Sequence, residues 1–396
     1  MIFKFLVDDK MSNKRKICVV ITSKQNYGRM KPLLEEIKNH DGLELQLVLG
    51  ASALLYRYGM FIDVIKKDGF EPLRSLYYII EGENLITQAK STGLGIVELS
   101  TAFEDLEPDI VVSIGDRFET MATAIAASYI NIPLAHIQGG EVTGNIDDSV
   151  RHAITKIAHL HFPATEKSAE RIIKMGEEPW RVHKVGCPSI DIIVRNNLEI
   201  NNKKFNSRYK GLGGSIDFRK PFILVIQHPV TTSYGDGREQ INETLDALKD
   251  RKEQKILIWP NNDAGSDDVA KGIRVFREKN AKSNFHYYRA FEPVDYLKLL
   301  SNTVCAVGNS SSFIREGSYF GTPSVIIGDR QDMREHGDNI VFSDYSQEEI
   351  AKKINNQIKH GRYSSSNIFG TGNASQKIAS ILHETKLNII KKKMTY

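Results

Sequence analysis

The clearest indication of the fold of this chain is the stretch Asp109-Ile110-Val111-Val112-Ser113-Ile114-Gly115-Asp116-Arg117-Phe118. Its apolar part is short and uninterrupted, as in a strand that is buried on both faces of a parallel sheet. Asp116 and Arg117 follow where the strand ends, and the alanine-rich run Thr120–Ile130 after them has the pattern of a buried helix. In such sheets, ligands bind beyond the carboxyl ends of the strands. The stretch therefore predicts an α/β fold and marks a candidate site.

The same alternation of strands and helices extends to both sides of this stretch. Helical spacing of apolar residues occurs over Met30–His40 and again from Val150 to His161. The other strand-like runs of this half are Ile17–Thr22, Leu43–Leu49, Pro133–Ile137 and His161–Ala164.

The rhythm breaks over Asn196–Arg219, which is rich in Asn, Lys and Gly and is predicted to be an interdomain linker. A second series follows, with strands predicted at Phe222–Ile226, Lys255–Trp259, Val304–Gly308 and Ser324–Gly328, and helices at Gln240–Lys249, Asp267–Lys279 and Pro293–Asn302. Two series joined by one linker predict two Rossmann-like domains that face a cleft. The predicted units are an extension (1–13), an N-terminal domain (14–195), the linker (196–219), a C-terminal domain (220–375), and a last helix with its tail (376–396).

Length and charge exclude several classes of protein. The 396 residues suit two domains, and the formal net charge of +4, from 53 basic and 49 acidic residues, is close to balance. No basic block is long enough for a nucleic-acid footprint, and we interpret the ending Lys391–Lys393 as a solvated, frayed terminus. No apolar run approaches the ~20 residues that span a membrane. Neither a nucleic acid nor a membrane is therefore expected as a partner.

The cysteines indicate the compartment. Cys18, Cys187 and Cys305 lie far apart, each beside apolar residues, and no CxxC pair exists. Buried free thiols in a reducing environment explain them, and the opening residues lack the long apolar region of a signal peptide. We expect a cytoplasmic protein without a bound metal.

Polar residues gather at the strand ends of the first half. Asp116 and Arg117 are costly to place beside a buried helix unless they have a function. They could form a structural ion pair that caps the helix, or Asp116 could act as an acid or base while Arg117 clamps a phosphate. Lys24, after the first strand, offers another cation, although a plain strand-to-helix connection explains that loop equally well.

The densest polar cluster spans His136–His152. Gly139 and Gly140 would allow the backbone to approach a ligand closely, and Glu141 and Asp147 accompany them. A capped helix with a charged outer face would explain the end of the cluster, but it does not explain the glycines or Glu141.

Polar residues also follow the predicted strands of the second half. His228 could carry a positive charge or donate to a phosphate, or it could be a structural histidine. Asn261 lies in a loop that a capped turn would explain equally well. After Gly308, Ser310 and Ser311 precede a predicted helix, where backbone and hydroxyl donors suit a diphosphate.

Two further side chains extend this predicted diphosphate site. Glu316, within the helix, could accept hydrogen bonds from ribose hydroxyls, and Arg330, after the last predicted strand, could reach the same ligand.

Taken in order, these motifs resemble those of the hydrolysing UDP-N-acetylglucosamine 2-epimerases, a family that includes bacterial sialic-acid enzymes. The resemblance covers about Lys14–Leu387 and implies the two-domain fold of the B-type glycosyltransferases (GT-B). Its most specific stretches are 115–118, 139–142 with 146–156, 227–232, 263–266, and 308–311 with Arg315 and Glu316.

The resemblance implies a reaction. UDP is eliminated to leave a 2-acetamidoglucal, and water then adds with inversion at carbon 2, with no cofactor. Asp116 and Asp147 match catalytic carboxylates, and His228 matches a histidine near the diphosphate. Arg117, Ser310, Ser311, Glu316 and Arg330 match nucleotide-binding positions.

Two positions depart from the family pattern. Lys24 stands where an Arg is usual, which keeps the charge but loses the two-pronged fork. Gln138 stands where the best-known members have a catalytic Glu, and a glutamine cannot act as an acid or base. Either another carboxylate replaces that Glu, with Glu141 the first candidate, or the substrate and proton route differ, or activity is lost.

Several alternatives stay open from sequence. A glycosyltransferase, a non-hydrolysing epimerase or a catalytically silent nucleotide-sugar-binding protein would use the same diphosphate site. The expected partners are a nucleotide-sugar, water and further copies of the chain, as a homodimer or homotetramer. The product could be N-acetylmannosamine or a 2,4-diacetamido-6-deoxymannose, for sialic or legionaminic acid synthesis.

Overall fold

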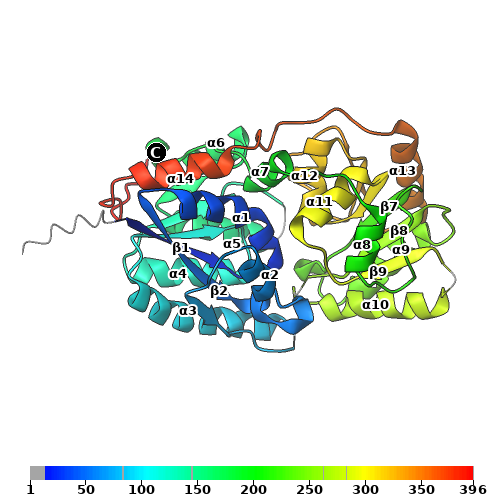
Figure 1. Cartoon of the computed structure of the whole chain (residues 1–396), viewed down its shortest axis with the longest axis horizontal. Coiled ribbons are helices and arrows are strands. Elements are labelled where there is room, and N and C mark those ends of the chain that lie inside the picture. The colour runs from blue at the N-terminus through cyan, green and yellow to red at the C-terminus, as the bar shows by residue number, and fades with distance from the viewer. Residues whose placement is uncertain (1–13, 83, 144–145, 262, 282, 396) are drawn as a thin grey trace, which may run out of the picture.

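The computed structural model describes residues 14–82, 84–143, 146–261, 263–281 and 283–395, so the predicted extension (1–13) lies outside the described residues. Two six-stranded parallel sheets, each flanked by helices, form the two halves of the molecule (Figure 1). This architecture confirms the predicted α/β fold with two Rossmann-like halves.

The N-terminal half has the strand order β3-β2-β1-β4-β5-β6. Alternate residues of β1 enter two different cores: Ile17 packs with helix α1, whereas Cys18 packs with α3 and α4. Both faces are buried, which is why the strand is apolar throughout. The elements are β1 (Arg15–Ile21), α1 (Lys24–Asn39), β2 (Leu43–Gly50), η1 (Ala51–Leu54), η2 (Tyr56–Tyr58), α2 (Ile62–Lys67), β3 (Arg74–Leu76), α3 (Leu85–Leu106), β4 (Ile110–Ile114), α4 (Phe118–Tyr129), β5 (Leu134–Ile137), α5 (Ile146–Ile157), β6 (Leu160–Phe162), α6 (Glu166–Lys174), η3 (Pro179–Arg181) and α7 (Pro188–Arg195).

The C-terminal half repeats the plan with the order β12-β11-β10-β7-β8-β9. Its elements are α8 (Asn202–Arg208), β7 (Phe222–Ile226), η4 (Thr231–Ser233), α9 (Gly237–Leu248), β8 (Gln254–Ile258), α10 (Ser266–Lys279), β9 (Phe285–Tyr288), α11 (Pro293–Asn302), β10 (Cys305–Gly308), α12 (Ser311–Phe320), β11 (Ser324–Ile327), β12 (Ile340–Ser343) and α13 (Gln347–His360). The last helix, α14 (Ala374–Glu384), joins the core of the N-terminal half.

The stretch predicted as a linker is more ordered than its composition indicates. It contains α8, and the Phe205 ring packs 4.9 Å from that of Tyr209 and 5.3 Å from that of Phe291, measured between centroids. Leu212 pairs with Tyr287 at the edge of the second sheet. Scattered aromatic residues therefore fold this stretch onto the C-terminal core despite its many Asn and Gly residues.

The prediction of a frayed C-terminus is wrong. Helix α14 returns from the C-terminal half and packs beside α1 (Figure 1). Beyond it, Arg181 donates to the carbonyls of Ile389 (3.0 Å) and Lys391 (2.8 Å). The Lys392 amine lies 2.8 Å from the Glu177 carboxylate and donates to the carbonyls of Lys156 and Ala158, at the end of α5. The buried carboxylate of Glu177 and the end of α5, both distant in sequence, therefore bind this basic tail.

Replacing Glu177 with glutamine should therefore lower the free energy of unfolding. Glu177 is buried and also bonds Lys156 and His161, so losing its charge should cost ~2–4 kcal/mol at neutral pH in urea denaturation. Burial opposes ionisation, but these three partners outweigh it and lower the pKa of Glu177 from 4.5 to about 2. Because ionisation stabilises the fold, the difference from wild type should shrink as the pH falls from 4.5 towards 2.

Glu166→Gln is the matched control, since the Glu166–Lys184 pair is exposed. That variant should change stability by less than about 0.5 kcal/mol. An effect of Glu177→Gln no larger than this would show that the tail contact contributes nothing.

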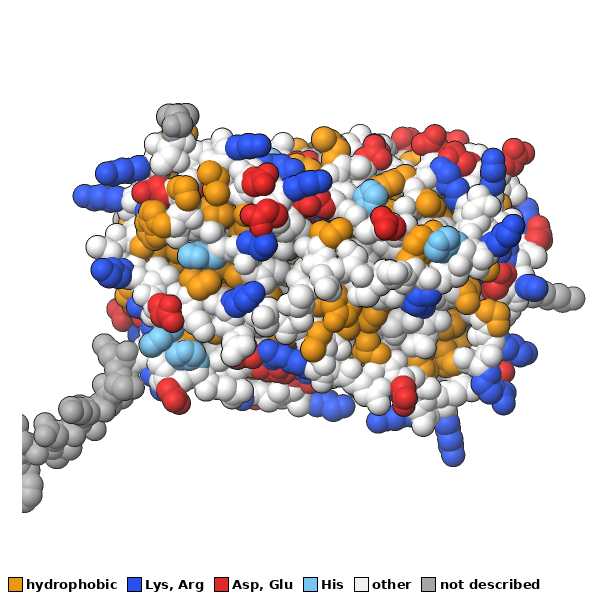
Figure 2. Space-filling view, turned by 90° about the horizontal axis from the view of Figure 1, so that it is seen from above, with side chains coloured by type: hydrophobic (Ala, Val, Ile, Leu, Met, Phe, Trp, Pro, Cys, Tyr) orange, Lys and Arg blue, Asp and Glu red, His pale blue; other side chains and the backbone are white. Residues whose placement is uncertain are grey.

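The three cysteines are buried free thiols, as predicted. On the face in Figure 2, basic and acidic side chains are interspersed, in keeping with the near-balanced charge. Within the described ranges, every helix is too short or too polar to cross a bilayer.

Candidate functional site

The site lies where the carboxyl ends of the two sheets face each other. In each sheet the strand order reverses between the two central strands, β1 and β4 or β7 and β10, which is where open α/β sheets bind ligands. One cavity there is lined by twelve side chains that the sequence analysis named as candidates: Lys24, Asp116, Arg117, Gln138, Glu141, Asp147, His228, Asn261, Ser310, Ser311, Glu316 and Arg330.

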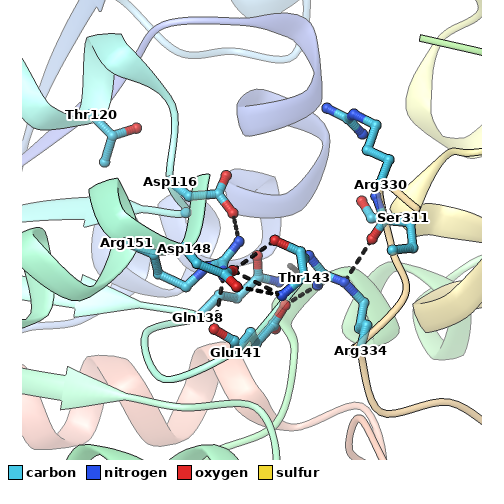
Figure 3. Close-up of polar contacts among 12 residues, drawn as sticks. Asp116, Thr120, Gln138, Glu141, Thr143, Asp148, Arg151, Ser311, Arg330 and Arg334 are labelled. Atoms are coloured by element: carbon cyan, nitrogen blue, oxygen red, sulfur yellow. Dashed lines mark hydrogen bonds and ion pairs between the residues drawn. The ribbon is translucent and has the colours of Figure 1, made fainter. Parts of the chain in front are cut away.

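Asp116 follows β4 and forms an ion pair with Arg151 of α5 (Figure 3). Arg151 also pairs with Asp148 at 2.6 Å and is almost fully buried. Burial alone would raise the pKa of Asp116, but Arg151 and Arg334 outweigh it and hold that pKa well below its ordinary value. Asp116 is therefore a carboxylate that stays ionised.

Asp147, in the first turn of α5, has the opposite tendency. Burial and the nearby charge of Asp116 raise its pKa to about 6. The cavity thus contains one carboxylate that stays ionised and one that exchanges protons near neutral pH, and this separation is typical of acid–base pairs.

Glu141 contacts the opposite half of the molecule. Its Oε2 accepts from Arg315 of α12 at 3.2 Å and from Arg334, which follows β11. Burial would raise the pKa of Glu141, but Arg334 and Arg315 more than offset it and lower that pKa. This environment favours a permanently charged carboxylate.

Gln138 makes two side-chain hydrogen bonds at the end of β5. Its Oε1 accepts from Arg29 at 2.9 Å, and its Nε2 donates to the Cys187 thiol at 2.9 Å. The backbone φ of Gln138 is +64°, a left-handed conformation that is costly outside glycine and is common at functional sites. Gln138 therefore fixes the direction of a cation that lines the cavity.

The two glycines after Gln138 serve a different purpose from the one expected. A Cβ on Gly140, whose φ is +75°, would lie 2.3 Å from the Ser168 carbonyl oxygen, and a Cβ on Gly139 would lie 2.9 Å from the Thr155 hydroxyl. Neither glycine lines the cavity. They allow the loop to pack against α5 and α6, which is a packing role that was not anticipated from the sequence. Residues 144–145 of this cluster lie outside the described residues.

His228 is a neutral histidine. Burial and the charge of Arg330 lower its pKa to about 3. The backbone N–H of Asn261 donates to His228 Nδ1 at 3.1 Å, so Nε2 carries the proton. Of the alternatives left open from sequence, a positive charge is therefore disfavoured, and a donor that needs no charge is favoured.

The turn after β10 presents the start of α12 to the cavity. Gly308 has φ +132°, and a Cβ there would lie 1.9 Å from the Ile226 carbonyl oxygen, so only glycine fits this crossing of strand ends. Ser310 caps the helix by accepting from the Ser312 N–H, and Ser311 begins it. The serine hydroxyl groups and the helix dipole make this a suitable anion site.

Asp263 was overlooked as a partner of the predicted phosphate ligands. Its carboxylate lies 2.7 Å from Arg117, in the N-terminal half, and 3.2 Å from Arg330. From the sequence, Asp263 was placed in a stretch typical of the family, 263–266, but was assigned no partner and no role. The cavity is also lined by Arg29, Arg315 and Arg334. Arg334 lies in the loop that follows β11, several residues after the strand ends, so a search of only the first residues after each strand does not find it.

Comparisons with known sequences agree with these features. The family described as UDP-N-acetylglucosamine 2-epimerase matches residues 35–383. UDP-N,N'-diacetylbacillosamine 2-epimerase (hydrolyzing) of Legionella pneumophila is 30% identical over 94% of this chain and 97% of its own. GDP/UDP-N,N'-diacetylbacillosamine 2-epimerase (hydrolyzing) of Campylobacter jejuni is 33% identical over 84% of this chain and 85% of its own.

The solved structures extend the likeness to the fold. The UDP-GlcNAc 2-epimerase of Neisseria meningitidis, crystallised with UDP-GlcNAc, superposes with a TM-score of 0.78 at 20% identity and covers 93% of this chain and 100% of its own. The resemblance and the GT-B-type fold expected from the motifs are both confirmed.

Proposed function

Since the chain belongs to the UDP-N-acetylglucosamine 2-epimerase family, we propose that it hydrolyses a UDP-N-acetylhexosamine and releases UDP and the free sugar inverted at carbon 2. The observation that carries this proposal is the pair Asp116 and Asp147, which line one cavity with pKa values displaced in opposite directions.

The diphosphate is held at the start of α12 in this proposal. Ser310 and Ser311 supply hydroxyl and backbone donors, and His228 supplies a neutral Nε2–H. Arg117 and Arg330 add positive charge from the two sides of the cavity. Donors and cations fixed around the departing phosphate stabilise the charge that develops as the C1–O bond breaks.

The two carboxylates then divide the proton transfers. Asp116, ionised, takes the proton from carbon 2 while UDP leaves from carbon 1, which gives a 2-acetamidoglucal with a C1–C2 double bond. Asp147, protonated in part near its pKa of about 6, returns a proton to the other face of carbon 2 while water supplies the hydroxyl at carbon 1. The remaining proton of that water restores Asp147, and Asp116 releases the proton that it took to solvent. The sum is one water consumed, UDP released and one inverted centre.

The sugar is the finer part of the proposal. The relatives from Legionella and Campylobacter are named for diacetylbacillosamine nucleotides, and Gln138 replaces an acidic side chain of the best-known members. Both observations favour a 2,4-diacetamido-6-deoxy sugar, on a route to nonulosonic acids, over N-acetylglucosamine.

NMR of the purified protein with each candidate nucleotide-sugar in heavy water tests the function. We expect UDP, free sugar of inverted configuration and deuterium at carbon 2. An inverted sugar still attached to UDP would indicate a non-hydrolysing epimerase, and turnover that requires an acceptor would indicate a glycosyltransferase. Protection against heat by UDP without any product would indicate a silent binding protein.

A further inference from the structure

Three arginines contact Glu141, and they come from both halves of the molecule. Figure 3 shows two of them, Arg151 and Arg334, beside Glu141. The carboxylate of Glu141 forms ion pairs with Arg315 and Arg334 from the C-terminal half. Its backbone carbonyl receives Arg151 from α5 at 2.7 Å. Glu141 and all three arginines are at most 6% exposed. Buried charges persist only when they are paired and hydrogen-bonded, so this cluster holds the two halves at one separation.

Two of the three arginines also contact a residue of the proposed reaction. Arg315 donates through Nη2 to the Ser311 hydroxyl at 2.7 Å, where the diphosphate is expected. Arg151 holds Asp116, the proposed base. Glu141 thus connects the phosphate end of the site with the proton-transfer end through one arginine on each side.

The contacts of Glu141 are unsuited to proton transfer. A proton donor must be protonated in part at working pH, and a base must be free to accept. Of the two carboxylate oxygens of Glu141, Oε2 accepts from both guanidinium groups, which favour the charged form and so oppose the role of proton donor. Oε1 is buried and has no hydrogen-bond partner among the described residues, and the charged form that the arginines favour is a weak base.

We propose that Glu141 is a positioning residue, which fixes Arg315 and Arg151 so that the diphosphate and carbon 2 are held at the right separation for Asp116. This inference rests on the proposed function for the identity of the ligand. It replaces the interpretation of Glu141 as a substitute acid or base. Because a misplacement of about 1 Å costs on the order of 100-fold in rate, such a connection has a measurable effect.

A double-mutant cycle tests this proposal. The variants are Glu141→Gln, Arg334→Gln and both together, with KM, kcat and UDP affinity by calorimetry as readouts. Glu141→Gln should weaken UDP binding and raise KM by about 10-fold or more, because two buried guanidinium groups lose the carboxylate that balances their charge. The double variant should be impaired less than the product of the single effects. Glu141→Asp, which keeps the charge, should recover part of the affinity.

Glu335→Gln is the matched control. Glu335 also bridges the halves, by accepting from Thr165, but it does not line the cavity. UDP affinity and KM should equal those of the wild type in this variant. If they fell as far as in Glu141→Gln, any loss of a contact between halves would have the same effect, and the specific role of Glu141 would be refuted.

Other outcomes decide between the interpretations. A kcat loss above about 100-fold in Glu141→Gln, with unchanged UDP affinity and a lost limb of the pH profile, would identify a proton-transfer group. A lower melting temperature with unchanged KM and UDP affinity would identify a structural role only. Either result overturns the proposal.

The proposal can still be tested if Glu141→Gln does not fold or if the wild type shows no turnover. If Glu141→Gln does not fold, Arg334→Gln alone should still weaken UDP binding, and unchanged affinity there overturns the proposal. UDP binding is measured without turnover, so a wild type that binds UDP but makes no product contradicts the proposed function and leaves the positioning result intact.

Discussion

Replacing Asp116 with asparagine is expected to lower kcat by on the order of 1000-fold, because an amide of the same size cannot accept a proton. UDP affinity should change little, since Asp116 pairs with Arg151 and not with the cations proposed to hold the diphosphate. Single-turnover release of UDP, followed together with deuterium uptake at carbon 2, measures the effect on the elimination step directly.

Asp148→Asn separates loss of a proton acceptor from loss of an ion pair. Asp148 pairs with the same Arg151 at 2.6 Å, yet it does not line the cavity. Its variant should retain kcat within about 10-fold of the wild type. Full UDP release by Asp116→Asn, or an equal loss in both variants, would refute the assignment of Asp116 as the base.

The interior of both sheets was predictable because burial on two faces makes central strands apolar throughout. Ile17–Thr22, Asp109–Gly115 and Phe222–Ile226 each coincide with a central strand to within two residues. The edge strands β3, β9 and β12 were not predicted. In β3, Arg74 and Ser75 are exposed, so no apolar run marks the strand, and only pairing with β2 identifies it.

The candidate site residues that directly follow a strand were also predictable, for a related reason. Parallel strands end at one edge of a sheet, so polar residues directly after each run, such as Asp116, His228 and Ser310, converge without any knowledge of the loops. Partners that come from later in a loop or from the opposite half could not be found in this way. Arg334 meets Glu141, and Asp263 meets Arg117, only because the two halves face each other.

The protonation states were also beyond the sequence. Asp116 and Asp147 are the same residue type, and the pKa of each depends on its neighbours in space. Arg151 lies four positions after Asp147 in the chain yet pairs with Asp116, which is 35 positions away. The proposed assignment of base and acid rests on that contact.

Replacing Asp147 with asparagine should stop the second proton transfer and at the same time stabilise the protein. An amide cannot donate the proton that carbon 2 needs, so kcat should fall by about 100- to 10,000-fold. In the wild type, kcat should decline as the pH rises above about 6, where burial and Asp116 place the pKa of Asp147. The activity that remains in the variant should lack this limb of the pH profile.

The stability effect follows from the sign of the same shift. The folded state raises the pKa of Asp147 from 3.8 to about 6, so the ionised side chain is penalised in the fold and the penalty is complete above pH 6. An asparagine removes it, by about 1–2 kcal/mol after allowance for the part of the side chain that reaches water. Thermal unfolding should show Asp147→Asn above the wild type at pH 7.5 and level with it near pH 4. Asp148→Asn should show neither effect, and a variant of Asp147 that kept the pH limb, or lost stability at pH 7.5, would exclude Asp147 as the proton donor.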